Sequence, residues 1–255
     1  MSTFDEYSHS YKFIRLKRRD GILEMSLHTN GGPLQWGLEP QAELGRAFGD
    51  VGADRENRVI ILTGSGNEFS GPRLDPDTAE FFHGAELTSS GVHSIHWNAR
   101  RLMTTLLDIE VPMIGVVNGP AKRHAELALM CDIVIAADDA SFEDTAHFHL
   151  GNIVPGDGIN IVYTMLMGLN RARYLMLTGQ VLTAREAKDM GLVAELLPRH
   201  ELLARAWELA EQLAKKPEFL LRYTRMVLTH PLKKLMDEGL QYSLALETLG
   251  ALDKR

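Results

Sequence analysis

Short runs of apolar residues, separated by turn residues and amphipathic stretches, fill the first three quarters of the chain. Residues 13–16 and 22–27 flank Asp20-Gly21, a pair that favours the positive φ angles of a tight turn, so an opening β-hairpin is predicted. Apolar runs rich in β-branched side chains are typical of strands covered on both faces. Such strands are predicted at residues 59–64, 112–119, 133–137 and 192–196.

Apolar residues three and four apart predict helices between these strands and throughout the C-terminal third. Thr183 and Glu186 form a capping box, and Gly191 suits the position just after a helix. Strands that alternate with helices indicate a layered α/β domain, with a core at 1–198 and a helical region at 199–255. The helices are predicted at residues 39–48, 94–107, 124–130, 159–167, 171–177, 183–190, 201–213, 218–228 and 232–249.

Composition excludes several classes of function. The formal net charge of −7 argues against a nucleic-acid partner, and the basic cluster Lys17-Arg18-Arg19 is interpreted as a solvated hairpin turn. No apolar stretch approaches the roughly 20 residues of a membrane helix, and no signal peptide is visible. Cys131 is the only cysteine, and its apolar surroundings predict a buried, inert thiol. A cytoplasmic protein is expected.

Three motifs resemble those of the crotonase (enoyl-CoA hydratase/isomerase) superfamily, in the same order along the chain. They are the apolar run at residues 59–64, the segment 117–121 leading to Glu126-Leu127-Ala128 and Cys131-Asp132, and Leu177-Thr178-Gly179-Gln180. The resemblance covers nearly the whole chain. It implies a spiral of ββα units with a helical C-terminal region that supports trimerisation and closes the active site.

The chain departs from the usual pattern of that superfamily at three places. After Phe69-Ser70, residues 71–74 replace the segment whose backbone holds a thioester, and Pro72 has no N–H to donate. Residues 122–125, Lys-Arg-His-Ala, replace the Gly-Gly-Gly turn of the oxyanion hole. Residues 142–148 lack the Pro-Glu pair that carries one hydratase carboxylate. Ordinary hydratase chemistry is therefore not expected.

What stands in these places resembles the 6-oxocamphor hydrolase branch of β-diketone hydrolases. This resemblance implies the hydrolysis of a carbon–carbon bond in a cyclic or bicyclic β-diketone by a retro-Claisen reaction, giving a keto acid. It also implies a homotrimer or a dimer of trimers, and a reaction without CoA, nicotinamide or metal. The matching residues are Trp36, His124, His147, Asp157 and Glu247.

The resemblance assigns a role to each of these side chains. His147 is predicted to be the base that activates water, and Asp157 to accept a hydrogen bond from its far ring nitrogen. His124 would offer an imidazole N–H to the developing oxyanion, and the Trp36 indole would bind a carbonyl. Glu247 would orient either the water or a histidine.

Other interpretations of the same residues stay open. Asp157 could simply cap a helix, and His147 and His149 could point to opposite sides of an extended segment. A metal site of His147, His149 and Asp144 is disfavoured, because no recognised ligand spacing accompanies it. The alternative functions are a divergent acyl-CoA hydratase, isomerase or lyase, and a non-catalytic scaffold. Residues 75–92 are expected to shape the substrate pocket.

Overall fold

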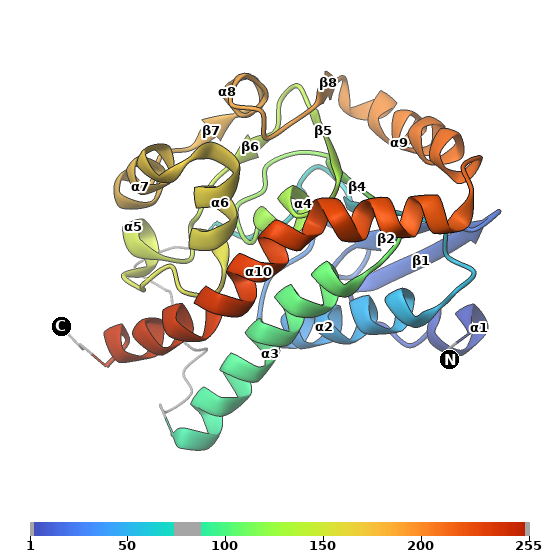
Figure 1. The fold of residues 1–255 in the computed structure, drawn as a ribbon. Helices are drawn as coiled ribbons and strands as arrows, with labels where there is room; N and C mark the ends of the chain where they lie inside the picture. The colour runs from blue at the N-terminus through green and yellow to red at the C-terminus, as the bar shows by residue number, and fades with distance from the viewer. Residues whose placement is uncertain (1–2, 74–87, 253–255) are drawn as a thin grey trace.

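The computed structural model describes residues 3–73 and 88–252. Most of the segment expected to shape the substrate pocket, residues 75–87, lies outside the described residues. Figure 1 shows a central sheet with helices around it and a long C-terminal helix that runs across the molecule. The α/β architecture predicted from the sequence is confirmed.

The sheet has six strands in the order β1-β2-β3-β4-β5-β8. β1 and β2 form the predicted hairpin, in which Asp20 and Gly21 adopt positive φ angles of 50° and 75°. All the later neighbours pair in parallel, so only the first pair is antiparallel. The strands are β1 (Ile14–Arg19), β2 (Ile22–Leu27), β3 (Val59–Gly64), β4 (Met113–Val117), β5 (Ile133–Ala137) and β8 (Glu195–Leu197).

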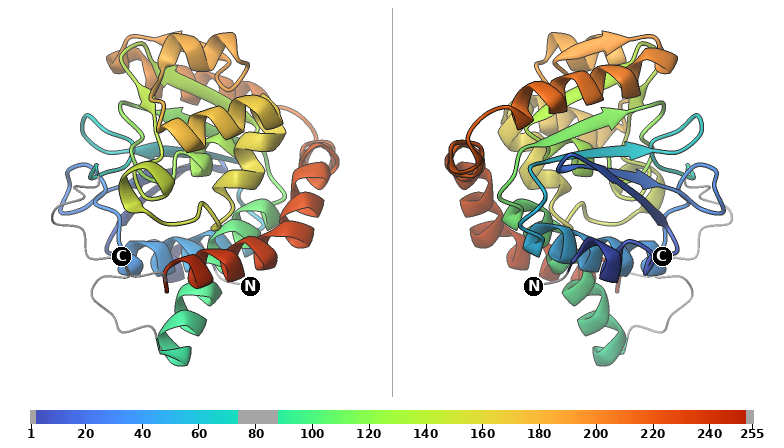
Figure 2. Two further views of the ribbon diagram at one scale, coloured as in Figure 1. Left: turned by 90° about the vertical axis from the view of Figure 1, so that its left-hand side faces the viewer. Right: turned by 90° about the vertical axis from the view of Figure 1, so that its right-hand side faces the viewer.

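Four long helices enclose this sheet. α2 (Leu38–Ala53) packs against α3 (Ser89–Asp108), and α9 (Arg199–Ala214) crosses β2 to β5, as both views of Figure 2 show. α10 (Glu218–Gly250) contacts α3 and α6. One cluster of buried apolar side chains joins the sheet to both C-terminal helices, so the helical region shares the core of the rest of the chain.

Shorter elements make up the rest of the described fold. They are α1 (Phe4–Tyr7), α4 (Glu126–Leu129), β6 (Ser141–Phe142), α5 (Phe148–Gly151), α6 (Ile159–Met167), α7 (Leu169–Thr178), β7 (Leu182–Thr183) and α8 (Ala184–Asp189). Two of them, β6 and β7, form a separate two-stranded antiparallel sheet. The others are helices of ten residues or fewer, and the loops of the candidate site lie next to α4, α5 and α6.

The basic cluster at residues 17–19 does not form the hairpin turn, so this interpretation was wrong. Its residues belong to β1, and the turn consists of Asp20 and Gly21 alone. Arg18 forms ion pairs of 2.7 Å with Asp54 and 2.6 Å with Glu56. The partners of this charge lie just after α2, far along the chain, where a local pattern cannot show them.

Two helices predicted at residues 218–228 and 232–249 are one continuous helix, α10, with Pro231 inside it. Proline removes one backbone N–H, which leaves the carbonyl four residues earlier without its helical partner. That carbonyl belongs to Val227, whose side chain is 71% exposed, so water can solvate this face of the helix.

The strand predicted at 192–196 begins instead at Glu195, and the helix predicted from residue 94 begins at Ser89.

Other features agree with the sequence interpretation. Thr183 and Glu186 form the capping box of α8, and Gly191 has a positive φ of 82°. Cys131 is buried, and burial raises the pKa of its thiol to about 12. No helix within the described residues is both long enough and apolar enough to cross a membrane.

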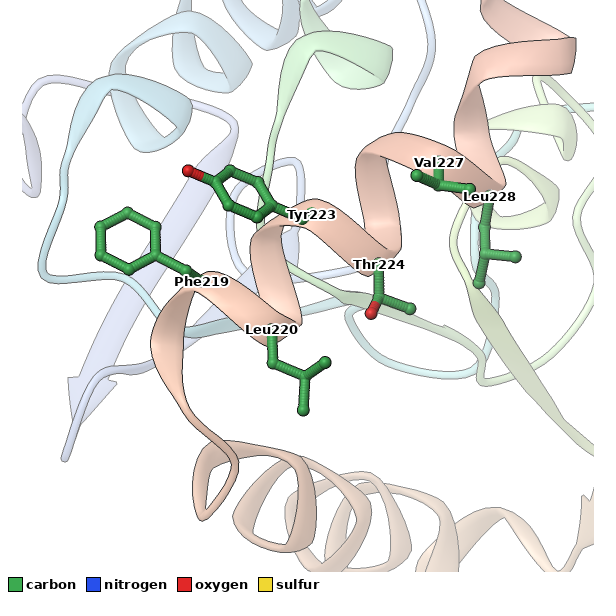
Figure 3. A pocket seen from close by; sticks show the side chains of 6 residues that line it. All are labelled: Phe219, Leu220, Tyr223, Thr224, Val227 and Leu228. Atoms are coloured by element: carbon green, nitrogen blue, oxygen red, sulfur yellow. The ribbon is translucent and has the colours of Figure 1, made fainter.

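The first half of α10 carries an uncovered apolar face. Phe219, Tyr223, Val227 and Leu228 are each at least 60% exposed, and they line a shallow hollow together with Leu220 and Thr224 (Figure 3). A contiguous apolar patch of this kind is unusual on a monomer and commonly marks a contact with another molecule.

Candidate active site

Loops from distant parts of the chain are joined at one end of the sheet. Ser70 forms a β-bridge with Ala121, and Ala121 forms another with Phe142. Gly119 is required in this crossing, because a Cβ atom there would lie 2.0 Å from the Asn67 carbonyl oxygen. The two segments that depart from the usual thioester-binding pattern, around residues 71–74 and 122–125, are therefore fixed beside the segment that carries His147.

His147 lies at the N-cap of α5 with both ring nitrogens next to carboxylates. Its Nδ1–H donates to Asp144 Oδ1 at 2.8 Å, and its Nε2 lies 3.4 Å from Asp157 Oδ2. Burial alone would lower the pKa of His147, but the charges of Asp144 and Asp157 outweigh burial and hold this pKa well above its usual value. The two carboxylates therefore favour the doubly protonated form of this ring.

His124 precedes the short helix α4 and has a positive φ of 51°. Its Nδ1–H donates to Glu126 Oε1 at 2.6 Å, and the same nitrogen lies 3.6 Å from Asp157 Oδ2. The ring stacks on Trp36 with a centroid separation of 3.8 Å and an interplanar angle of 30°. Trp36 itself is fixed by a 2.6 Å hydrogen bond from its backbone N–H to the Gly71 carbonyl.

Asp157 lies between the two imidazoles, just before α6. Burial would raise its pKa, but His147 and His124 outweigh burial and keep the pKa below its usual range. The carboxylate also accepts from the Ile159 N–H at a long 3.4 Å, while Gly158 is the N-cap residue of α6. Helix capping is therefore a minor part of what this side chain does, and its main partners are the histidines.

Glu247 reaches the cluster from α10 across Gly156. A Cβ atom at residue 156 would lie 2.8 Å from Glu247 Oε2 and 2.4 Å from the Ser243 carbonyl, so only glycine permits this approach. Oε2 is buried and has no hydrogen-bond partner in the described part of the chain. Burial, followed by the charge of Asp157, raises the pKa of Glu247 to about 8, so the side chain is a neutral acid at neutral pH.

The structure thus places the five residues predicted from the sequence in a connected set: Trp36 against His124, Asp157 between His124 and His147, and Glu247 beside Asp157. The predicted contact between Asp157 and His147 is present, but the shorter hydrogen bond to that ring comes from Asp144. The ring of His149 lies apart, against Gly179, and its segment forms α5 rather than an extended strand.

Sequence reasoning missed two carboxylates that hold the histidines. Asp144 had been considered only as a metal ligand, and Glu126 only as part of a family motif. Both lie two or three residues from their histidine, a spacing that would have identified them if the loop conformations were known. The base role assigned to His147 stays a prediction, and the carboxylates next to both of its ring nitrogens are the geometry that bears on it.

A metal ion is disfavoured by the hydrogen bonding, although three ligand atoms are near enough. His124, Glu126 and Asp157 offer atoms within 4.8 Å of one another. The 2.6 Å contact between His124 Nδ1 and Glu126 is a hydrogen bond, so this nitrogen carries a proton where a ligand needs a lone pair. These residues are better described as a hydrogen-bonded cluster.

This fold and its loops define the class of protein. The family model for enoyl-CoA hydratase/isomerase matches residues 21–248, and the chain belongs to this family, within the crotonase superfamily. A probable peroxisomal enoyl-CoA hydratase of Arabidopsis thaliana is 32% identical over 80% of this chain and 72% of its own length. A carnitinyl-CoA dehydratase of Salmonella arizonae is 30% identical over 90% of this chain and 85% of its own length.

One solved structure is more similar than these relatives. It is ABDH, a β-diketone hydrolase from the cyanobacterium Anabaena sp. PCC 7120, bound to (S)-3-oxocyclohexyl acetic acid. The two chains are 40% identical, 97% of each is covered, and the TM-score is 0.91. An enoyl-CoA hydratase/isomerase from Mycobacterium paratuberculosis has the same fold with a TM-score of 0.85, at 21% identity over 96% of this chain and 95% of its own.

The raised pKa of Glu247 predicts a specific dependence of stability on pH. In the unfolded chain this group ionises near 4.5, whereas in the folded protein it ionises near 8. Between these values the folded state holds a proton that the unfolded state releases, so its contribution to the free energy of unfolding falls as pH rises. Glu247→Gln should remove this contribution and flatten the fall in melting temperature between about pH 5 and 6.5.

Histidines of the unfolded chain begin to titrate in the upper part of this window, and all the variants compared share that background. Glu238→Gln, an exposed change on the same helix, is the matched control and should leave the slope unchanged. Identical slopes for wild type and Glu247→Gln would contradict the buried neutral acid.

Proposed function

We propose that the protein hydrolyses a carbon–carbon bond in a β-diketone, with cyclic or bicyclic diketones as the substrate class. The observation that carries this proposal is the buried pair of histidines that share Asp157, with Trp36 stacked on one of them. The full-length similarity to a β-diketone hydrolase bound to a keto acid supports it. The loops give no comparable support for thioester binding. Pro72 has no backbone N–H to donate, and residues 122–125 replace the Gly-Gly-Gly turn of the oxyanion hole.

The reaction adds one water molecule across a carbon–carbon bond. The water oxygen bonds to one carbonyl carbon, and the bond from this carbon to the central carbon then breaks. The first fragment becomes a carboxylic acid, and the second leaves as the enolate of the remaining ketone, which takes up a proton at carbon. In a ring both fragments stay joined, so the product is a single keto acid.

Two cationic or donating groups suit the negative charge that develops on the carbonyl oxygens. Asp144 and Asp157 favour the doubly protonated form of His147, and the Trp36 indole N–H can only donate. Each fixed donor aimed at an oxyanion contributes about 3 kcal/mol to the stability of the transition state. Glu247, as a neutral acid, adds no fourth negative charge beside Asp157 and can orient the water.

A divergent acyl-CoA hydratase is the second candidate, because several relatives at about 30% identity are named for CoA thioesters. The decisive experiment incubates the pure protein with 1,3-cyclohexanedione-type diketones, bicyclic diketones and crotonyl-CoA. Loss of diketone absorbance with formation of a keto acid is expected, and Asp157→Asn serves as the background control. Hydration of crotonyl-CoA with inert diketones would overturn the proposal and favour the hydratase.

Removal of the His147 ring should impair turnover without unfolding the protein. His147→Ala is expected to lower kcat for the diketone about 100- to 1000-fold, because one fixed charged donor is lost. His149→Ala, two residues away with its ring packed on Gly179, is the control and should keep kcat within about threefold of wild type, as expected away from the site. Near-normal kcat in His147→Ala would show that the cluster around this ring is not used in the reaction.

We also propose that the apolar face of α10 is covered by further copies of this chain in a homotrimer or dimer of trimers. The exposed side chains of Phe219, Tyr223 and Val227 form a patch typical of an interface between subunits. The long helix α10 also delivers Glu247 to the cluster, so assembly would hold this helix in place.

Light scattering of the purified protein should give a mass of three or six chains. Val227→Asp places a charge in the centre of the patch and should shift the protein towards smaller species, because an unpaired buried charge is costly. Lys234→Glu, on the same helix outside the patch and 65% exposed, should leave the mass unchanged. A wild-type monomer at micromolar concentration would contradict the assembly.

A further inference from the structure

The turn at residues 122–124 is fixed from both sides by the segments that flank it. The Lys122 backbone N–H donates to the Ser70 carbonyl at 2.9 Å, and the Thr145 backbone N–H donates to the Lys122 carbonyl at 3.3 Å. The Ser70 hydroxyl donates to the Arg123 carbonyl. The backbone that carries the Arg123 side chain is therefore held by the same loops that build the candidate active site.

Three basic side chains follow one another in this turn, and two of them have an acid close by. Lys122 Nζ lies 2.6 Å from Glu68 Oε1, and His124 Nδ1 lies 2.6 Å from Glu126 Oε1. The guanidinium of Arg123, between them, forms no ion pair or hydrogen bond in the part of the chain that the structure describes, and its Nε is buried without a partner. A desolvated cation is unfavourable unless a negative group pairs with it.

Arg123 lies among the acids of the cluster. Burial lowers the pKa of its guanidinium, and the charges of Asp144, Asp157 and Glu126 raise it. An arginine stays charged at neutral pH even so, and its N–H groups can bind a carboxylate through two parallel hydrogen bonds. Each of the three acids lies next to a histidine ring. The residue as a whole is only partly buried, so a ligand can reach the guanidinium.

The proposed hydrolysis produces a carboxylate in these surroundings. The carbon that is attacked by water leaves as a carboxylic acid, which is ionised at neutral pH. The negative charges of Asp144 and Asp157 would repel this product, and such repulsion is strongest where water is excluded. His147 offsets it only in part, since each of its ring nitrogens already has a carboxylate next to it. A product anion needs a cation that no acid of the chain has taken, and Arg123 has such a charge.

We propose that Arg123 binds the carboxylate of the keto acid product and makes the site selective for ligands with an anion at the cleaved end. This inference rests on the proposed diketone hydrolysis and adds a binding residue to it. The guanidinium N–H groups donate to the two carboxylate oxygens, so the contact forms only when the carbonyl carbon has become an acid.

The test measures the binding of 5-oxohexanoate, the keto acid that hydrolysis of 1,3-cyclohexanedione gives, by isothermal titration calorimetry. Arg123→Gln should raise the Kd about 10- to 100-fold, because charge-assisted hydrogen bonds are lost. Arg123→Lys keeps the charge without the planar fork and should give an intermediate Kd. The uncharged methyl ester of the same acid should bind the wild type and Arg123→Gln equally.

Arg58→Gln is the matched control. Arg58 is also a partly buried arginine whose Nε is buried without a partner, but its Nη2 donates to the Ala214 and Lys216 carbonyls beyond the end of α9. Its replacement should leave the Kd for 5-oxohexanoate unchanged. A lower melting temperature in Arg123→Gln with an unchanged Kd would show that Arg123 is only a structural counter-charge, and would overturn the proposal. Failure of the wild type to bind acetate, 5-oxohexanoate and cyclohexylacetate would also overturn it.

This inference and the proposed function can fail separately. If the wild type leaves diketones intact but carboxylate binding depends on Arg123, the hydrolysis is wrong and the anion site stands. If diketones are cleaved and 5-oxohexanoate inhibits the wild type and Arg123→Gln with the same inhibition constant, the hydrolysis stands and the anion site is wrong.

Discussion

The burial of Asp157 between two imidazoles is the interaction on which the rest of the site depends. One carboxylate cannot be left unpaired in this interior, and its charge is balanced by His147 on one side and His124 on the other. Two further carboxylates contact the same rings: Asp144 at the other nitrogen of His147, and Glu126 at the His124 nitrogen that also lies near Asp157. The result is a row of alternating acids and imidazoles whose proton positions are coupled.

This row gives two identical side chains different surroundings. His147 has an acid at each nitrogen, whereas His124 has acids near one nitrogen only. Glu247 cannot ionise easily next to this row, because Asp157 already carries the negative charge there. The electrostatic surroundings of each side chain in this row thus follow from where the fold places the acids.

The sequence predicted much of this structure and left out what depends on distant contacts. Asp20-Gly21 sets its turn locally, and the strand runs at residues 59–64 and 133–137 show their burial in their composition, so these elements were predicted at the right places. Pro231 looked like a helix end, because a local pattern does not show that the freed carbonyl faces solvent.

The same limit applies to the site. Family resemblance located the histidines and Asp157, but a sequence does not distinguish a solvated glutamate from the fully buried Glu126. The protonation of each ring depends on the acids around it, and these come from α4, the segment before α5 and the segment before α6. Loss of the thioester-binding loops would remove the contacts with which a crotonase fold holds its usual substrate. The row of acids and imidazoles lies beside the segments that replace these loops.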